Sequence, residues 1–144
     1  MLHAPFEAAA PGAKPPPEHH VYVIDDEASL RDSSCFLLAT LGLACTQYAN
    51  GQDFLADVET LEPGCILLDV LMRRMGGLEV QAELNRRGID WPIIFMSGHD
   101  DIPTVVRAMK NGAVEFLEKP FSDEQLLASL HRGFVKLRNG HRSA

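Results

Sequence analysis

The sequence predicts an α/β fold in which helices cover both faces of a parallel sheet, and three observations support this. Apolar runs and amphipathic helical patterns alternate five times between residues 21 and 138. The apolar runs lack period-two alternation, which is typical of parallel strands buried on both faces. Strand–helix repeats require parallel strands joined by right-handed crossovers. We therefore expect one doubly wound, three-layer α/β sandwich.

The first two strand–helix units have clear boundaries. Residues 21–24 form a β-branched and aromatic strand, and the helical spacing of apolar residues over 28–41 stops at Gly42. A second strand is expected at residues 45–48. The helix after it, residues 52–61, has apolar residues at i, i+1, i+4 and i+7 and is therefore amphipathic.

The next two units repeat this pattern. The apolar run 65–69 predicts a buried third strand, and the helix expected at residues 78–87 ends before Gly88. Residues 92–97 form another apolar run, and a helix is expected at residues 103–111.

The last unit contains a fifth strand at residues 114–118 and a helix at residues 122–138. That helix begins with Ser122 and, three residues later, Gln125, the pattern of a capping box. Its basic C-terminal residues suit the negative end of the helix dipole.

The two ends of the chain are expected to lie outside this domain, which spans residues 20–138. Residues 1–19 are rich in Ala and Pro and lack an apolar period, so we predict a disordered N-terminal extension. Residues 139–144 are predicted to be a C-terminal tail.

Composition limits the function classes. The 144 residues are 46% hydrophobic and 23% charged, as in ordinary soluble domains. A net charge of −7 argues against direct nucleic-acid binding, which needs a basic surface. No stretch approaches the roughly 20 apolar residues of a membrane span, and no secretory signal is visible. We therefore expect a cytoplasmic protein that does not bind membranes.

The cysteines predict neither a disulfide framework nor a zinc site. Cys35, Cys45 and Cys65 are odd in number and widely spaced, without a Cys-x-x-Cys pair. We expect reduced, packed thiols.

Polar residues end four of the predicted strands: Asp25 and Asp26, Asp69, Ser97 and Lys119. The carboxyl ends of parallel strands share one edge, so these groups should converge there. Taken alone, Asp69 is better explained as a helix cap or a turn residue. Four strands that end this way predict a shared site.

The chemistry of this site suggests phosphoryl transfer. Three carboxylates repel one another unless a cation lies between them, and all-oxygen ligands suit Mg²⁺. A carboxylate beside Mg²⁺ and an ammonium group can attack a phosphoryl group. We expect Asp69 to be the nucleophile, with Lys119 stabilising the added charge and Ser97 donating a hydrogen bond.

These residues resemble the CheY-like receiver domains of bacterial two-component response regulators. Residues 69–72 with Met75 and Gly77 are similar to the family's phosphoacceptor loop, and residues 108–121 look most like the FixJ branch. The resemblance covers residues 21–135. It implies five strands in the order 2-1-3-4-5 and five helices.

The resemblance also implies residue roles. Asp26 and Asp69 would bind Mg²⁺ directly, Asp25 through water, and Leu71 through its backbone carbonyl. Asp69 would be the phosphoacceptor, with phosphoryl transfer and hydrolysis catalysed by the domain itself and no other enzyme activity.

Signalling follows from the resemblance too. Ser97 and Phe116 match the family's switch pair, which reshapes the face formed by residues 103–111, 114–118 and 122–138. The implied partners are a sensor histidine kinase, then a downstream protein or an output domain of the same protein, and a second copy through that face after phosphorylation. The chain is expected to be a stand-alone regulator or the receiver of a FixJ-like transcription factor.

One residue departs from the family pattern. Arg73 replaces the usual proline four residues after the phosphoacceptor, which frees the loop and adds a backbone donor. Its charge would either attract phosphodonors or be solvated.

Two other functions remain open at this point. A Mg²⁺-dependent phosphohydrolase would need a second acid where Leu71 stands. A receiver that acts as a scaffold without phosphorylation would not need the complete acidic set.

Overall fold

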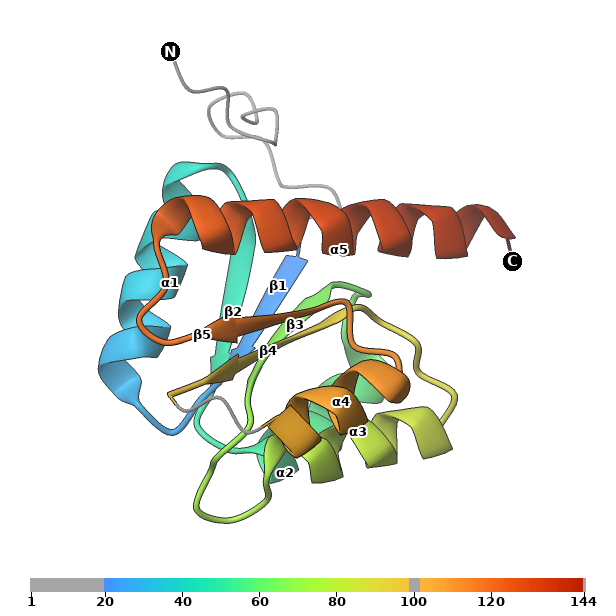
Figure 1. Ribbon diagram of the computed structural model, residues 1–144. Coiled ribbons are helices and arrows are strands. Elements are labelled where there is room, and N and C mark those ends of the chain that lie inside the picture. The colour runs from blue at the N-terminus through green and yellow to red at the C-terminus, as the bar shows by residue number, and fades with distance from the viewer. Residues whose placement is uncertain (1–19, 99–101, 144) are drawn as a thin grey trace.

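The computed structural model describes residues 20–98 and 102–143 and contains a five-stranded parallel sheet in the order β2-β1-β3-β4-β5 (Figure 1). The predicted fold class and strand order are therefore confirmed. The strands are β1 (His20–Ile24), β2 (Ala44–Tyr48), β3 (Cys65–Asp69), β4 (Ile93–Ser97) and β5 (Glu115–Glu118). The extension predicted to be disordered, residues 1–19, lies outside the described residues.

The five predicted helices are also present. They are α1 (Ala28–Thr40), α2 (Gly51–Asp57), α3 (Gly77–Arg86), α4 (Ile102–Lys110) and α5 (Asp123–Ser143). The helix expected over residues 52–61 finishes as a 3₁₀ turn, η2 (Val58–Thr60). None of the helices among the described residues is long and apolar enough to cross a membrane.

The last helix differs from expectation at its C-terminus. It runs to Ser143, so residues 139–143, expected to be a tail, continue the helix. No proline follows Arg138 to stop it, and Asn139 and Gly140 keep helical backbone geometry. The predicted capping box at its N-terminus is confirmed, because Ser122 Oγ accepts the Gln125 N–H at 3.1 Å and Gln125 Oε1 accepts the Ser122 N–H at 2.8 Å.

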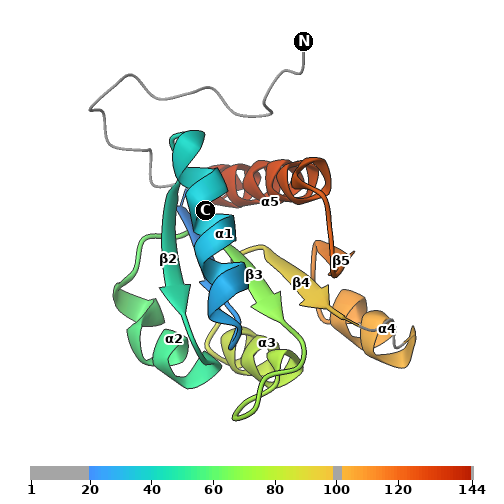
Figure 2. The same ribbon diagram turned by 90° about the vertical axis from the view of Figure 1, so that its left-hand side faces the viewer.

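Helices cover both faces of the sheet and divide the core in two. α1 and α5 lie on one face, and α2, α3 and α4 lie on the other (Figures 1 and 2). Successive side chains of a strand point to opposite faces, so β1 sends Val21 and Val23 toward α1 and α5, and Tyr22 and Ile24 toward α2 and α3. All five residues of β3 are buried, as expected for a central parallel strand.

Two glycines let helices approach the sheet closely. A Cβ on Gly133 in α5 would lie 2.8 Å from Cys65 Sγ, and one on Gly77 would lie 2.5 Å from the Asp69 carbonyl oxygen. The Gly77 N–H donates to the Val70 carbonyl at 2.8 Å. α3 therefore begins directly against the carboxyl end of β3.

α4 is fastened mainly at its C-terminal end. Gln81 Nε2 of α3 donates to the Ala108 carbonyl at 2.9 Å, and Asn85 Nδ2, one turn further along α3, donates to the Asn111 carbonyl at 3.1 Å. Within α4, all of which is described, Ala108 is the only buried residue. Ile102 and Val106, nearer its start, are 73% and 44% exposed.

The expectation of three reduced thiols is wrong for two of them. Cys35 of α1 and Cys45 of β2 form a disulfide with Cα atoms 5.3 Å apart. Gly42, at a φ of +79°, reverses the chain after α1 so that β2 returns beside that helix. Cys65 is free and buried, and burial raises the pKa of its thiol.

Reduction of this disulfide should destabilise the fold. Closing a segment with a separation of ten residues is worth about 2–3 kcal/mol of unfolding free energy in the chain-entropy account. Guanidinium unfolding with and without dithiothreitol measures the difference. In the Cys35→Ser, Cys45→Ser double variant the reductant should have no effect, and an unchanged wild-type midpoint under reduction would contradict the prediction.

Candidate functional site

The carboxyl edge of the sheet brings together the polar residues predicted to meet there. Asp69 and Ser97 are the last residues of β3 and β4. Asp25 and Asp26 follow β1 directly, and Lys119 follows β5. Because these four strands are neighbours and parallel, their ends share one edge (Figure 1).

Three carboxylates form the centre of this edge. Oxygen atoms of Asp25, Asp26 and Asp69 all lie within 4.8 Å of one another. Asp25 and Asp69 are buried, whereas Asp26 is exposed. The site therefore has two carboxylates at its base and one at its opening.

Lys119 links the two buried carboxylates. Its Nζ lies 2.7 Å from Asp25 Oδ2 and 3.6 Å from Asp69 Oδ2. Its backbone N–H donates to the Ser97 carbonyl at 2.7 Å, which fixes the end of β5 against β4, and its peptide bond to Pro120 is cis. The ammonium group thus reaches the site from the edge strand.

Burial and charge set the protonation of these groups. Burial, and then the charge of Asp25, raise the pKa of Asp69 to about 6, although Lys119 and the Leu71 N–H oppose the shift. Burial alone would lower the pKa of Lys119, but its hydrogen bond to Asp25 and the charges of Asp69 and Asp25 outweigh this and raise it. Lys119 therefore stays charged beside two acids.

Backbone N–H groups hold each carboxylate. Glu27 donates to Asp25 Oδ1 at 2.9 Å, Leu71 to Asp69 Oδ1 at 3.3 Å, and Arg73 to Asp26 Oδ2 at 3.2 Å. The added backbone donor expected at residue 73 is present, and its acceptor is the Asp26 carboxylate.

Arg31 was missed altogether. Its Nη1 donates to the Asp25 carbonyl at 2.7 Å and its Nε to Gln47 Oε1 at 3.2 Å. It fastens the start of α1 and the end of β1 to β2. Its spacing from the acidic pair is part of no motif, so the sequence carried no signal for this contact.

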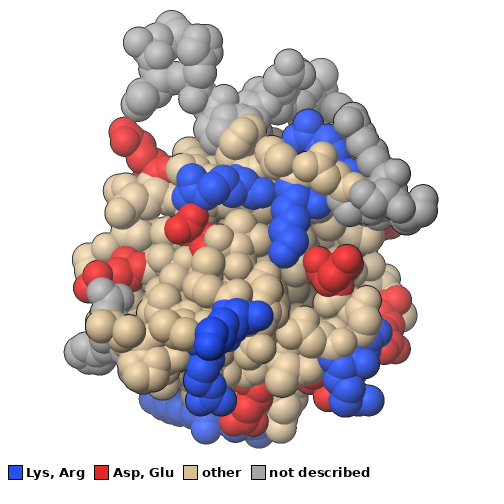
Figure 3. All heavy atoms as spheres, turned by 45° about the vertical axis from the view of Figure 1, so that its right-hand side comes forward, with Lys and Arg blue, Asp and Glu red and all other residues tan. Residues whose placement is uncertain are grey.

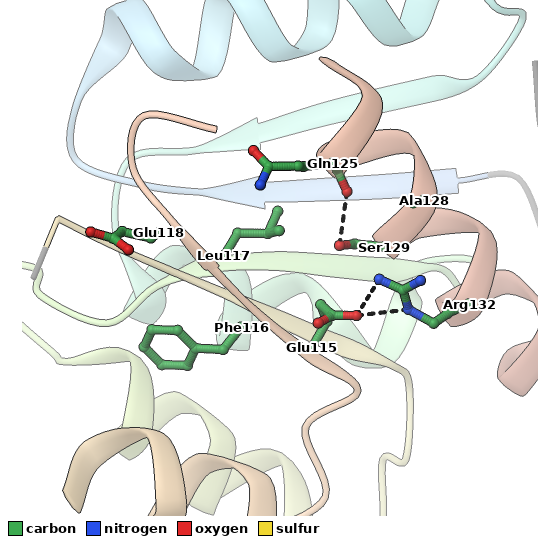
Figure 4. A pocket seen from close by; sticks show the side chains of 8 residues that line it. All are labelled: Glu115, Phe116, Leu117, Glu118, Gln125, Ala128, Ser129 and Arg132. Atoms are coloured by element: carbon green, nitrogen blue, oxygen red, sulfur yellow. Dashed lines mark hydrogen bonds and ion pairs between the residues drawn. The ribbon is translucent and has the colours of Figure 1, made fainter. Parts of the chain in front are cut away.

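The proposed switch residues lie on neighbouring strands without facing each other directly. Strand register pairs Phe116 with Phe95 and Ser97 with Glu118. The Phe116 ring is half-buried and stacks on Phe95 with centroids 6.1 Å apart. In Figure 4 it points to the side of β5 opposite Leu117. Ser97 is buried.

The donor set fits Mg²⁺. The three groups present only carboxylate oxygens, which magnesium prefers over nitrogen or sulfur ligands. In an octahedron with metal–oxygen bonds of about 2.1 Å, opposite ligands are roughly 4.2 Å apart. Oxygens within 4.8 Å of one another can close on such an ion with small rotations.

This arrangement also suits an incoming phosphoryl group. A cation among the carboxylates and the Lys119 ammonium would supply positive charge on two sides of the Asp69 oxygen. Positive groups of this kind stabilise the oxygens of a transferred phosphoryl group. The structure does not test the role expected for the Leu71 carbonyl.

Comparisons with known proteins agree with this geometry. The sequence profile of the response regulator receiver domain matches residues 21–131. The transcriptional regulatory protein FixJ of Azorhizobium caulinodans is 47% identical over 110 residues, which cover 76% of this chain and 52% of FixJ. The chain thus spans about half the length of that relative.

Solved structures are similar over nearly the whole domain. The crystal structure of FixJ-N is 35% identical with a TM-score of 0.76, covering 81% of this chain and 93% of that one. The solution structure of the beryllofluoride-activated NtrC4 receiver domain dimer is 31% identical with a TM-score of 0.77, covering 82% and 98%.

Replacing Asp69 should stabilise the metal-free protein. Its pKa of about 6 in the folded state exceeds the value of about 3.9 for an unfolded aspartate. Between these values the folded state binds more protons, so wild-type stability falls as the pH rises from about 4 to 6 and stays lower above that range. Asp69→Asn should remove this loss and raise the free energy of unfolding by about 1–3 kcal/mol at pH 7.

Urea unfolding in chelator between pH 4 and 8 measures this effect. Asp90→Asn is the matched control. Asp90 is exposed and lies before the start of β4, at the end of this strand that is remote from the site. An Asp69→Asn variant that keeps the wild-type pH slope would contradict the prediction.

Proposed function

The chain belongs to the response regulator receiver domain family of two-component signalling, with FixJ-like relatives, and on that premise we propose that Asp69 accepts a phosphoryl group from a sensor histidine kinase. The observation that carries the proposal is the position of Asp69 at the end of β3, beside two further carboxylates and the Lys119 ammonium. The reaction requires Mg²⁺.

The residues that would hold the metal are those of the acidic edge. Asp26 and Asp69 would bind it directly, Asp25 through a water molecule, and Leu71 through its backbone carbonyl. A bound ion would supply positive charge to neutralise phosphoryl oxygens. The cluster of three carboxylates supports the assignment of the aspartates.

Phosphoryl transfer then proceeds at Asp69. One carboxylate oxygen forms a bond to phosphorus while the bond from phosphorus to the phosphohistidine nitrogen breaks, and the electron pair of that bond stays on the imidazole. The Lys119 ammonium group pairs with a phosphoryl oxygen. Its position between Asp25 and Asp69 supports this role, because it already lies near the oxygen that receives the group. The Ser97 hydroxyl donates a hydrogen bond to the same group.

Water later hydrolyses the acyl phosphate, which releases inorganic phosphate and restores the Asp69 carboxylate. The domain catalyses only the formation and loss of its own phosphoryl group. It is therefore a signalling protein rather than an enzyme that turns over a separate substrate.

The phosphoryl signal leaves the site through Ser97 and Phe116. Movement of the Ser97 hydroxyl toward the phosphoryl group opens space into which the Phe116 ring turns, and the face formed by α4, β5 and α5 changes shape. The Phe116 ring stacks on Phe95 and is only half-buried, which supports this role because the core does not enclose the ring completely.

The reshaped face recruits a downstream protein or an output domain of the same polypeptide. The FixJ relative is named a transcriptional regulatory protein and is about twice the length matched here. We propose that this chain serves either as a stand-alone regulator or as the receiver part of such a protein. On either reading it works in the cytoplasm and contacts neither DNA nor membrane itself.

The same face can pair with a second copy. Ile102, Val106 and Met109 form an exposed apolar stripe on α4 at i, i+4 and i+7. Figure 3 shows Lys and Arg side chains toward the top, where α5 runs, with Asp and Glu close to them. A surface with both charge signs suits the self-complementary contact of a two-fold dimer.

A hollow on the same face is lined by residues of β5 and α5. Its volume is about 390 Å³, and the ion pair between Glu115 and Arg132 crosses it (Figure 4). The NtrC4 structure is described as a beryllofluoride-activated receiver domain dimer, which supports dimer formation by this chain after phosphorylation but names no face.

Phosphorylation can be tested by intact-mass measurement. Wild type treated with acetyl phosphate and Mg²⁺ should gain the mass of one phosphoryl group, and chelator should abolish the gain. Asp69→Asn should gain nothing, whereas the control Asp90→Asn should behave like wild type. A gain that persists in Asp69→Asn, or no gain in wild type, would contradict the proposal.

Dimer formation can be tested by light scattering after phosphorylation. The molar mass should double, and Val106→Asp should prevent this without blocking the mass gain at Asp69, because the variant places charge in the apolar stripe. Phe36→Asp is the matched control, since Phe36 is 76% exposed on α1, on the other face of the sheet. A wild-type mass that does not change would exclude this assembly.

A further inference from the structure

We propose that the backbone N–H of Arg73 positions the Asp26 carboxylate for Mg²⁺, a role that the proline usual at this place in the family cannot perform. This inference rests on the proposed function, since it concerns the metal site that phosphoryl transfer requires. The Arg73 N–H donates to Asp26 Oδ2 at 3.2 Å across 47 residues of sequence. It connects the loop after β3 to the loop after β1.

The position of the Asp26 carboxylate depends strongly on this one hydrogen bond, whereas Asp25 and Asp69 each have more than one contact. Asp25 accepts from Lys119 Nζ and the Glu27 N–H, and Asp69 lies near Lys119 and accepts from the Leu71 N–H. Both are buried, so the surrounding protein also limits their rotation. Asp26 is exposed, and the bond from Arg73 is what holds its carboxylate within the cluster.

Repulsion makes such a tether useful. Without a cation, two neighbouring carboxylates push the Asp26 side chain toward solvent, and rotation outward restores its hydration. A backbone donor offsets part of that repulsion and reduces the ordering that metal binding must otherwise impose. The ion then meets three carboxylates that already lie together.

The tether does not compete with the metal. A carboxylate has two oxygens and about four lone-pair positions, so Asp26 can accept the Arg73 N–H at Oδ2 while Oδ1 remains available to a cation.

The donor is the backbone rather than the guanidinium. Proline at residue 73 would remove the N–H, while any other residue would keep it. The side chain of Arg73 is exposed, and its charge and its backbone can therefore be separated by substitution. Arg73→Ala removes the charge and keeps the donor, whereas Arg73→Pro removes both.

Mg²⁺ binding without any phosphodonor tests the proposal. Isothermal titration with MgCl₂ at physiological salt should give Arg73→Ala an affinity within about twofold of wild type, because exposed charge is largely screened. Arg73→Pro should bind about 3- to 10-fold more weakly than Arg73→Ala, the expected loss for one hydrogen bond. Arg74→Ala controls for loss of charge in the same loop.

Three results would overturn the inference. Equal affinity of Arg73→Pro and Arg73→Ala would show that the N–H is dispensable, and an equally large loss in Arg73→Ala would assign the effect to the guanidinium. Wild type that binds no Mg²⁺ would overturn the proposed metal site and this inference with it. Wild type that binds Mg²⁺ leaves the proposed site standing whichever way the two variants compare.

If Arg73→Pro does not fold, hydrogen exchange of the metal-free protein tests the same hydrogen bond in another way. The Arg73 amide should exchange about 3- to 10-fold faster in Asp26→Ala than in wild type, because its acceptor is gone. Asp32→Ala, an exposed change on α1, should leave that rate unchanged. An Arg73 amide that exchanges equally fast in wild type and Asp26→Ala would overturn the inference.

Discussion

The site depends on one cation, the ammonium group of Lys119. Two carboxylates, Asp25 and Asp69, are buried at the same edge of the sheet, and burial of like charges side by side is costly. Lys119 offsets this cost at 2.7 and 3.6 Å from them. Since Lys119 follows the edge strand β5, the compensation exists only when β1, β3, β4 and β5 have assembled in the order observed. The charge balance of the site therefore depends on the topology of the fold.

Backbone N–H groups donate the hydrogen bonds that Lys119 does not supply to the three carboxylates. Each of the three carboxylates accepts an N–H from a loop at the carboxyl edge, and α3 can begin beside Asp69 because Gly77 has no side chain to collide with that residue's carbonyl. Fixed donors of this kind need not reorganise when charge arrives. The pKa of Asp69 is still raised, first by burial and then by the charge of Asp25, so these donors do not offset the whole cost of the buried carboxylate. The fold thus tolerates a local cost in stability at the place where charge is to be accommodated.

The sequence was sufficient for the fold class and for the residues at the carboxyl edge, because both follow from periodicity and from the geometry of parallel strands. Asp69 and Lys119 meet wherever β3 and β5 flank β4 in one parallel sheet. Contacts that depend on how the helices pack could not be predicted from the sequence. The Cys35–Cys45 bond depends on how β2 lies beside α1, and the Arg31 contact depends on side-chain reach. The length of α5 was missed because a helix can continue through weak ending signals when nothing blocks it. The metal ligands and the switch pair remain proposals.

The attachment of α4 differs between its two ends. Amide groups of Gln81 and Asn85 donate to the carbonyls of Ala108 and Asn111 at its C-terminal end, while its first six residues contribute no buried side chain. Displacing the start of α4 therefore exposes less buried apolar surface than displacing its C-terminal end, and it costs correspondingly less free energy.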